Sequence, residues 1–175
     1  MWLRSAAWAS SGRLQRKMLI PEHIGTYIAY NPETGELRCI AAHHKSRIGT
    51  VVGLANQKGY ATIGFEGRRF FVHRVAWFLM TGEQPPAVID HRDLDGRNNR
   101  WDNLRAATIS QNTANQRPRG RFMKGVTLHR TGRYQAQVKR AGRNHYLGCF
   151  DTEIEAHEAY VVAAKRLHGE FARAS

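Results

Sequence analysis

The sequence has few cysteines, and this shortage excludes two classes of protein. The 175 residues contain only Cys39 and Cys149, which are far apart in the chain and form no CxxC pair. Their spacing matches neither a zinc ligand set nor the disulfide framework of a small secreted domain. We therefore expect two reduced thiols and no zinc.

Acidic residues are also scarce. The chain has 14 Asp and Glu against 27 Lys and Arg, which gives a formal net charge of +13. Such an excess favours a polyanionic partner, either nucleic acid or an anionic membrane surface. A membrane is the poorer match, because the sequence has no run of about 18 apolar residues and its longest helical pattern has an Ala/Tyr face suited to packing. Nucleic acid is the expected partner.

The first 17 residues contain no acid and are rich in Arg, Ser and Ala. This composition is that of a transit peptide, whereas the apolar stretch is too short for a secretory signal. A start codon upstream of the true one, with Met18 opening the product, is the interpretation we favour. We treat residues 1–17 as a non-structural N-terminal extension and expect a protein that is not secreted.

Turn-forming dipeptides and alternating apolar residues predict strands and one helix near the N-terminus. Two hairpins are expected, one around the Asn-Pro and Thr-Gly dipeptides of residues 31–35 and one around Glu66-Gly67. The compact apolar run 73–80, which Gly82 follows, predicts a short helix with a sharp stop.

A polar loop between two further predicted strands, 88–90 and 104–108, has the residues of a catalytic site. Asp90-His91 places a carboxylate and an imidazole side by side where the first strand ends. After the second strand, Ser110 is expected to cap a short helix. Hydrolysis of a phosphodiester needs a metal held by hard oxygen ligands and a base for the attacking water. Carboxylate and amide side chains can supply the oxygens, and an imidazole can act as the base near neutral pH. On this chemistry alone, a turn-forming loop with a structural histidine is an equal alternative.

The strings VHRVAWFLMTG, IDHRDLDGRNNRWDNLRAAT and QN together resemble the HNH endonucleases of phage and group I intron type, over residues 27–115. The resemblance implies a ββα-metal finger in which His91 is the general base and Asn103 is a catalytic residue that holds the loop. It further implies that Asp90 and Asn112 bind Mg²⁺ or Mn²⁺, with Asn112 in place of the last histidine of the family name. The implied activity is nicking or cleavage of DNA by a homing or mobile-element enzyme, in the cytoplasm of a phage-infected or bacterial cell.

Several neighbours of this motif have two possible roles. Asn98 and Asn99 are expected to connect the loop through local backbone hydrogen bonds, and Asn98 is an alternative to Asn103 as the middle residue. His73 either packs in the interior or assists catalysis, while Arg74 is expected to reach a phosphate.

The C-terminal part has a second basic segment, which contains nine Lys and Arg and no acid from Arg117 to Cys149. Three short strands, 125–130, 133–140 and 143–150, are expected to form an antiparallel sheet with Gly-containing turns. Thr152 and Glu155 have capping-box spacing, and a helix that ends at Gly169 should cover one face of the sheet. Alternation then places Tyr134, Ala136 and Val138 of the middle strand toward the helix.

The string LG-x-F-DT-x-x-EA-x-x-AY-x-x-AA, from Leu147 to Ala164, is similar to the DNA-binding domain of plant ethylene-response (Apetala-type) transcription factors. This resemblance implies that the three-stranded sheet lies in a groove of double-stranded DNA. The predicted DNA contacts of the whole chain are Arg74, Arg97, Arg105, Thr127, His129, Arg130, Arg133, Gln135, Gln137, Lys139, Arg143 and Tyr146.

Together these patterns predict an α+β protein with N-terminal β-hairpins, a ββα-metal finger, and a three-stranded sheet packed on one helix. We expect an endonuclease domain at 18–115, a basic linker at 116–122 and a DNA-binding domain at 123–175. No small-molecule cofactor and no membrane partner are expected, and the oligomeric state is open. The alternative function is a catalytically inactive DNA-binding regulator that keeps the fold; nothing in the sequence favours an RNA-binding protein.

Overall fold

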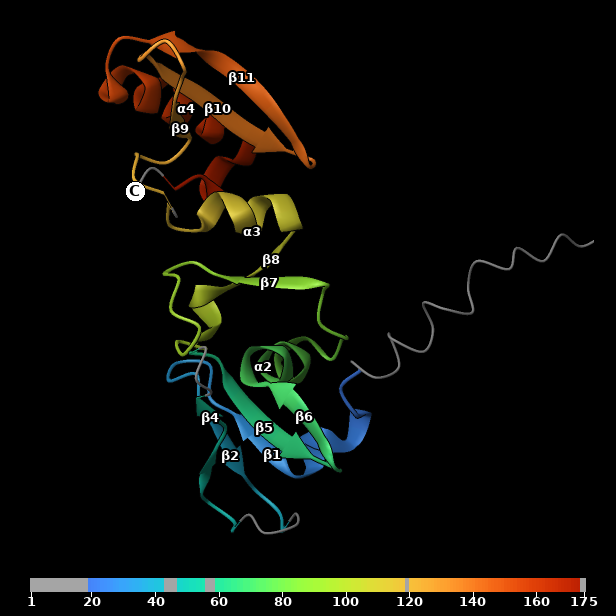
Figure 1. The fold of residues 1–175 in the computed structure, drawn as a ribbon. Coiled ribbons are helices and arrows are strands. Elements are labelled where there is room, and N and C mark those ends of the chain that lie inside the picture. Colours follow the sequence, from blue (N-terminus) through green and yellow to red (C-terminus); the bar gives the residue numbers. More distant parts are fainter. Residues whose placement is uncertain (1–18, 43–46, 56–58, 119, 174–175) are drawn as a thin grey trace, which may run out of the picture. The chain divides into compact units, whose positions relative to one another are not determined.

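The computed structural model of the chain describes residues 19–42, 47–55, 59–118 and 120–173 (Figure 1). The predicted N-terminal extension lies outside these residues. The chain forms two compact units. Unit 1 comprises Met1–Pro85 with Asp95–Leu104, and unit 2 comprises Pro86–Leu94 with Arg105–Ser175. These are units of packing, and the domain limits drawn from the sequence stay a prediction.

The described residues of unit 1 form two small antiparallel sheets and one α-helix. In chain order its elements are η2 (Glu22–Thr26), β1 (Ile28–Tyr30), β2 (Leu37–Cys39), β3 (Val51–Val52), β4 (Leu54–Ala55), β5 (Ala61–Phe65), β6 (Arg68–Phe71), α2 (Val72–Thr81) and η3 (Trp101–Asn103). The sheets have the orders β1-β2-β3 and β4-β5-β6. Both predicted hairpins are confirmed, since β1 pairs with β2 and β5 pairs with β6. The short strands β3 and β4 were not predicted.

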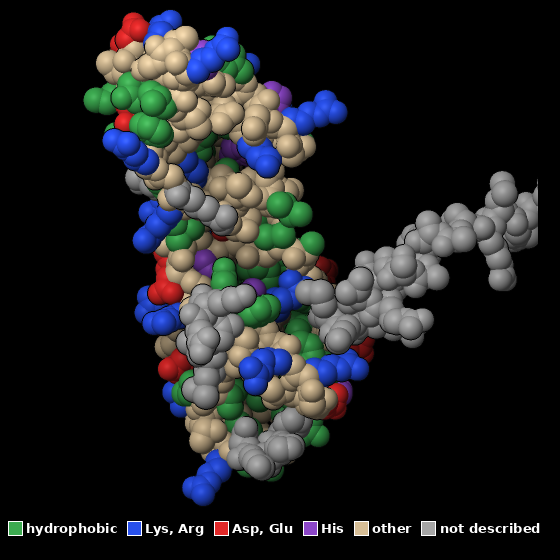
Figure 2. Space-filling model, viewed as in Figure 1, with side chains coloured by type: hydrophobic (Ala, Val, Ile, Leu, Met, Phe, Trp, Pro, Cys, Tyr) green, Lys and Arg blue, Asp and Glu red, His purple; other side chains and the backbone are tan. Residues whose placement is uncertain are grey.

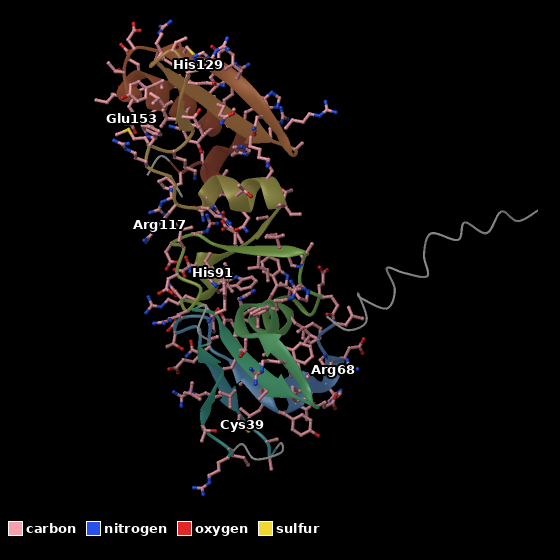
Figure 3. All side chains as sticks on the ribbon, in the orientation of Figure 1. Cys39, Arg68, His91, Arg117, His129 and Glu153 are labelled. Carbon is pink, nitrogen blue, oxygen red and sulfur yellow. The ribbon has the colours of Figure 1, made fainter. Side chains whose placement is uncertain are left out.

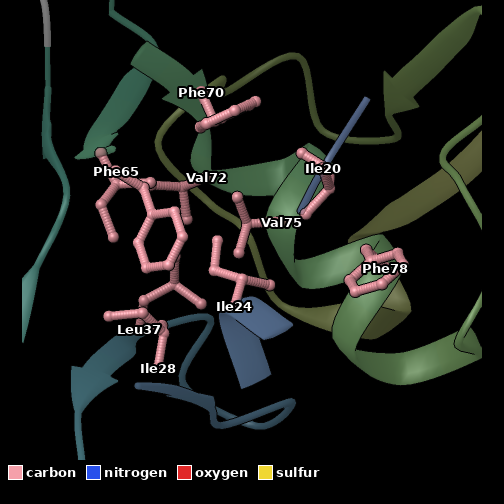
Figure 4. Packing of buried hydrophobic residues seen from close by; sticks show 10 residues of the cluster. Ile20, Ile24, Ile28, Leu37, Phe65, Phe70, Val72, Val75 and Phe78 are labelled. Carbon is pink, nitrogen blue, oxygen red and sulfur yellow. The ribbon is translucent and has the colours of Figure 1, made fainter. Parts of the chain in front are cut away.

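The interior of unit 1 is built from large apolar side chains (Figure 4). Period-2 alternation buries Ile63 and Phe65 of β5, and Val72 and Val75 of α2 share one helix face at a spacing of three residues. Burying one such side chain stabilises a fold by about 1.5–3 kcal/mol. The buried cluster consists of Ile20, Ile24, Ile28, Leu37, Ile63, Phe65, Phe70, Val72, Val75 and Phe78.

Unit 2 begins with the strand that leads into the polar loop. In chain order its elements are β7 (Val88–His91), β8 (Leu104–Ala107), α3 (Ile109–Asn115), β9 (Val126–Leu128), β10 (Tyr134–Arg140), β11 (Arg143–Phe150), α4 (Glu153–His168) and η4 (Gly169–Phe171). β7 and β8 form a two-stranded sheet, and Leu104 at the start of β8 belongs to unit 1. The predicted three-stranded antiparallel sheet is confirmed, in the order β11-β10-β9.

The prediction that Ser110 caps α3 is wrong. The cap is Thr108, whose Oγ1 accepts a hydrogen bond from the Gln111 backbone amide at 3.2 Å, while Gln111 Oε1 accepts from the Thr108 amide at 2.8 Å. This reciprocal capping box starts the helix two residues earlier than Ser110 would. Ser110 therefore lies in the first turn, and its Oγ is buried without a hydrogen-bond partner among the described residues.

The sheet of unit 2 packs on α4 through the face of β10 that the alternation predicted. Ala136 and Val138 of β10 are 0% and 2% exposed, and on α4 the side chains of Ala156, Tyr160 and Ala164 are buried in the same clusters. The capping box of Thr152 and Glu155 is present at the start of α4. The α+β fold class is therefore confirmed. None of the helices in the described ranges has the length and apolarity needed to span a bilayer.

Candidate nuclease site and basic sheet

The carboxylate of Asp90, near the end of β7, lies in a buried polar network within unit 2. Arg105 of β8 donates to Asp90 Oδ2 from Nε at 2.9 Å and lies 2.8 Å away through Nη2. Asn115 Nδ2, from the last residue of α3, lies 3.0 Å from Oδ1 and 3.1 Å from Oδ2. The side chains of Arg105 and Asp90 are 8% and 2% exposed. An arginine and an amide therefore fix the orientation of this carboxylate.

His91 ends β7, directly after Asp90 (Figure 3). Its backbone carbonyl accepts hydrogen bonds from Asn115 Nδ2 at 2.9 Å and from the Leu94 amide at 3.1 Å. The first bond connects the strand end to α3, and the second starts the turn that follows. Hydrogen bonds from α3 and from the following turn thus hold the backbone that carries the imidazole.

Asn112 lies on α3, one turn before Asn115, and its side chain is partly exposed. The role of Asn112 as a metal ligand stays a prediction. Asn115 was not among the predicted site residues, although its spacing of three from Asn112 on a helix places both amides near one face. Within the described ranges, no three His, Cys, Asp or Glu side chains gather as a metal cluster. The predicted metal ligands, the carboxylate of Asp90 and the amide of Asn112, differ from such a cluster because they are only two and one of them is an amide.

The loop of residues 95–104 belongs to unit 1 and is connected by its own asparagines. Asn103 Nδ2 donates to the Asn98 carbonyl at 2.7 Å, and Asn99 Nδ2 donates to the Arg97 carbonyl at 3.0 Å. Asn98 Oδ1 accepts from the Arg100 amide at 3.3 Å. The local hydrogen bonds predicted for Asn98 and Asn99 are therefore present. The catalytic role of Asn103 stays a prediction.

The first hairpin of the chain anchors this loop from within unit 1. The Tyr30 hydroxyl donates to the Asn99 carbonyl at 2.6 Å, and the Trp101 amide donates to the Pro32 carbonyl at 3.0 Å. Gly35 approaches so closely that a Cβ atom there would lie 2.6 Å from the Asn99 and Arg100 backbone. The hairpin therefore acts as a backbone platform for the loop.

His73 and Arg74 begin α2, and the structure shows how each side chain is packed. His73 is 8% exposed and stacks on Phe71 at 5.4 Å, with Tyr60 at 5.8 Å. Arg74 Nη2 donates to the Pro85 carbonyl at 3.3 Å. The packing interpretation of His73 accounts for these contacts.

One face of the C-terminal sheet presents many of the residues predicted to contact DNA. The register pairs Gln135 with Thr127, Gln137 with Tyr146 and Lys139 with Asn144, and cross-strand partners share a face. Because Ala136 and Val138 face α4, this set lies on the opposite face. Thr127, Lys139 and Tyr146 are exposed, while Gln135 and Gln137 are partly buried. Figure 2 shows Lys and Arg side chains projecting over the β10–β11 hairpin.

The remaining predicted contacts lie at the ends of the strands. Arg130 and Arg143 are exposed. Arg133 forms an ion pair with Asp151 at 2.8 Å and donates to the Cys149 carbonyl at 3.1 Å. His129 Nδ1 lies 2.8 Å from Thr131 Oγ1 in the turn before β10. These side chains therefore lie at the edges of the sheet and in its turns.

Parts of the chain are similar to known proteins. Residues 70–114 match the HNH endonuclease family model. An uncharacterised HNH endonuclease of Acanthamoeba polyphaga mimivirus is 31% identical over 118 residues, which cover 66% of this chain and 62% of the viral protein. The chain thus spans less than two thirds of that relative.

Two plant proteins match a shorter stretch. APETALA2-like protein 2 of Oryza sativa, from subspecies indica and japonica, is 46% identical over 61 residues, which are 34% of this chain and 14% of each plant protein. No solved structure matches the chain significantly. The family model and the viral relative agree with the HNH motif around Asp90-His91, and the plant match agrees with the three-stranded sheet on its helix. Residues 70–114 are thus similar to HNH endonucleases, and another part of the chain is similar to APETALA2-like proteins.

Proposed function

We propose that the protein is a metal-dependent endonuclease that hydrolyses phosphodiester bonds in double-stranded DNA. The observation that carries the proposal is the buried network around Asp90, in which Arg105 and Asn115 fix a carboxylate beside His91. Burying a charge is costly even when it is paired and hydrogen-bonded, and apolar side chains could fill the same space without that cost, so packing alone does not explain a buried Asp90. The HNH match over residues 70–114 supports the same activity.

The donor set at Asp90 fits a hard divalent cation. Arg105 binds Oδ2 twice, whereas Oδ1 accepts only from Asn115 among the described residues. A carboxylate oxygen has two lone pairs, so Oδ1 keeps acceptor capacity. We assign Asp90 and Asn112 as the residues that would hold Mg²⁺ or Mn²⁺, because hard cations prefer carboxylate and amide oxygens. When bound, the ion would stabilise the charge on the phosphate and on the leaving oxygen.

The other steps are carried by side chains of the chain itself. A ring nitrogen of His91 accepts the proton of the attacking water, and Asn103 maintains the loop through its bond to the Asn98 carbonyl. Arg105 neutralises Asp90 in the interior, and in this proposal it acts as a support for the carboxylate instead of as a DNA contact. Arg74 and Arg97 are proposed to meet phosphates.

The C-terminal sheet is proposed to supply most of the affinity for DNA. Its open face has Thr127, Gln137, Lys139 and Tyr146 in adjacent register, and such donors can reach base edges and phosphates in a major groove. Since phosphate contacts release counterions, the affinity should fall steeply with salt. A homing or mobile-element role is proposed on the resemblance of the HNH motif to phage and intron enzymes.

Cleavage of supercoiled plasmid and of phage genomic DNA tests this function. We expect nicked or linear product with Mg²⁺, no product with EDTA, and a loss of roughly 100-fold or more for His91→Ala. His23→Ala is the matched control, because His23 is an exposed histidine of unit 1 that pairs with Glu66, whereas the network is built from residues of unit 2. Binding without cleavage of either DNA would identify the protein as an inactive DNA-binding regulator.

A further inference from the structure

The guanidinium of Arg105 contacts the C-terminal end of the described chain as well as Asp90. Nη1 donates to the Glu170 backbone carbonyl at 3.1 Å and lies 3.3 Å from Glu170 Oε2. The guanidinium carbon lies 3.7 Å from the centre of the Phe171 ring, which is a cation–π distance. Both contact residues belong to η4, the turn that follows α4. The three guanidinium nitrogens of Arg105 thus contact two partners: Nε and Nη2 contact Asp90, and Nη1 contacts Glu170 of η4.

Glu170 also contacts the residue that follows His91. Its Oε2 lies 2.6 Å from Nη1 of Arg92, and this hydrogen bond, with the charges of Arg92 and Arg105, lowers the pKa of the Glu170 carboxyl. A single carboxylate thus contacts two arginines, Arg92 directly after His91 in the chain and Arg105 on β8.

The position of η4 is fixed by the C-terminal module, which consists of strands β9, β10 and β11 with α4 and η4. Gly169 ends α4 with a φ of +56°, and His168 Nε2 lies 3.0 Å from the Lys139 carbonyl of β10. Lys124, just before β9, donates to the carbonyls of Ala114 and Gln116 and so holds the end of α3 against the C-terminal module. The helix that supplies Asn115 and the turn that supplies Glu170 are consequently parts of one packed body.

We propose that Glu170 and Phe171 are positioning residues of the nuclease site, which hold Arg105 and through it the Asp90 carboxylate. The proposal rests on the proposed endonuclease function and adds a second task to the C-terminal module. Besides binding DNA, the module completes the support of the nuclease carboxylate. A positional error of about 1 Å in a reacting group can cost up to roughly 100-fold in rate, so weak support should appear in kcat.

Full-length Glu170→Ala and Phe171→Leu, with Glu158→Ala as the matched control, test this role. Glu158 is an exposed acid of α4, so its loss changes the net charge equally without touching the network. We expect kcat at saturating DNA to fall roughly 10-fold in both test variants, with the DNA dissociation constant in EDTA within about twofold of wild type. Glu170→Gln, which keeps an acceptor oxygen, should recover part of the loss.

Binding of Mn²⁺, measured by calorimetry without DNA, gives a second reading that does not need cleavage. Weaker Mn²⁺ binding in Glu170→Ala than in Glu158→Ala supports the proposal even for a wild type that does not cut DNA, in which case only the endonuclease function fails. Values of kcat and Mn²⁺ affinity equal to those of Glu158→Ala would overturn it. So would a loss confined to DNA affinity. Melting temperatures identify a variant that has unfolded, and Phe171→Leu keeps the apolar packing so that the role of the ring can still be measured.

Discussion

The two parts of the HNH segment are held in place by different forces. In unit 1, the loop of residues 95–104 rests on backbone contacts with the first hairpin, and the unit has a core of large apolar side chains. In unit 2, Asp90 and α3 are held by the charges and amides of Arg105 and Asn115. The loop depends on close backbone packing and on uncharged local hydrogen bonds, whereas the buried carboxylate depends on a cation and an amide that must be present and correctly oriented.

This difference predicts how each part fails. Close packing resists small changes in volume and loses stability gradually as contacts are removed. A buried ion pair adds little net stability relative to an apolar replacement, but removing one member leaves an uncompensated charge. Removing one charged member of the network in unit 2 should therefore lower stability sharply, and removing an exposed charge elsewhere is the control.

The largest loss is expected when Arg105 is removed. Arg105→Met leaves the Asp90 carboxylate buried without its cation, and we expect the free energy of unfolding to fall by about 3–5 kcal/mol. Arg38→Met is the control, because Arg38 forms an exposed ion pair with Glu36 that should be worth at most about 1 kcal/mol. Urea unfolding measures both. Equal losses in the two variants would remove the contrast between the units.

A smaller loss is expected when the backbone platform of unit 1 is disturbed. Gly35 has a φ of +77°, and a Cβ there would meet the Asn99 and Arg100 backbone, so Gly35→Ala should cost of order 1–3 kcal/mol. Gly132→Ala separates the two causes, since Gly132 has a φ of +83° but open space around its Cβ position. Hydrogen exchange should show faster opening of the loop for Gly35→Ala alone. Equal exchange in both variants would mean that the close approach does not hold the loop.

Matched capping boxes allow a finer comparison within unit 2. Thr108→Ala and Thr152→Ala each remove the cap of one helix, and each should lower the free energy of unfolding by about 1 kcal/mol. Thr108 caps the helix that ends at Asn115, so we expect its loss to reduce cleavage more than the loss of Thr152 at equal stability. Thermal unfolding and plasmid cleavage measure the two effects. A larger activity loss for Thr152→Ala would assign the support of the site to α4 instead.

Local patterns in the sequence were sufficient to predict most of the fold. Turn dipeptides identified the hairpins around Glu66-Gly67 and residues 31–35, and period-2 alternation placed Ala136 and Val138 against α4. The cap of α3 was predicted wrongly because Thr108 and Ser110 are both good capping residues. The reciprocal partner, Gln111, three residues after Thr108, is the signal that separates them.

The support of the site could not be predicted in the same way. Arg105 lies 15 positions from Asp90 and 65 from Glu170, and no periodicity connects residues so far apart. Its basic character suggested a phosphate contact, since a sequence does not show whether an arginine faces solvent or an internal carboxylate. Asn115 was within reach of prediction through its helical spacing from Asn112, whereas Phe171 follows the helix end and carries no motif.

The smallest expected effect is a pH dependence of unit 2 that arises from Lys124. Burial, with a contribution from the charge of Arg173, lowers the pKa of this amine from 10.5 to about 8. Between about pH 8 and 10.5 the unfolded chain therefore binds more protons than the folded one, and stability should rise with pH in this window. The neutral amine keeps two N–H donors, enough for the Ala114 and Gln116 carbonyls.

For a fully buried group, a shift of this size would be worth roughly 3 kcal/mol, but Lys124 is only half-buried and solvent screening should reduce its contribution to about 1 kcal/mol. Urea unfolding at pH 7, 8, 9 and 10 measures the increase, and Lys124→Met should lack it. The difference between the two proteins cancels the ionisation of other groups, including the tyrosines. If wild type and Lys124→Met respond equally to pH, charge burial at the end of α3 does not contribute to stability, and the contrast between a charge-dependent unit 2 and an apolar unit 1 is limited to Asp90 and Arg105.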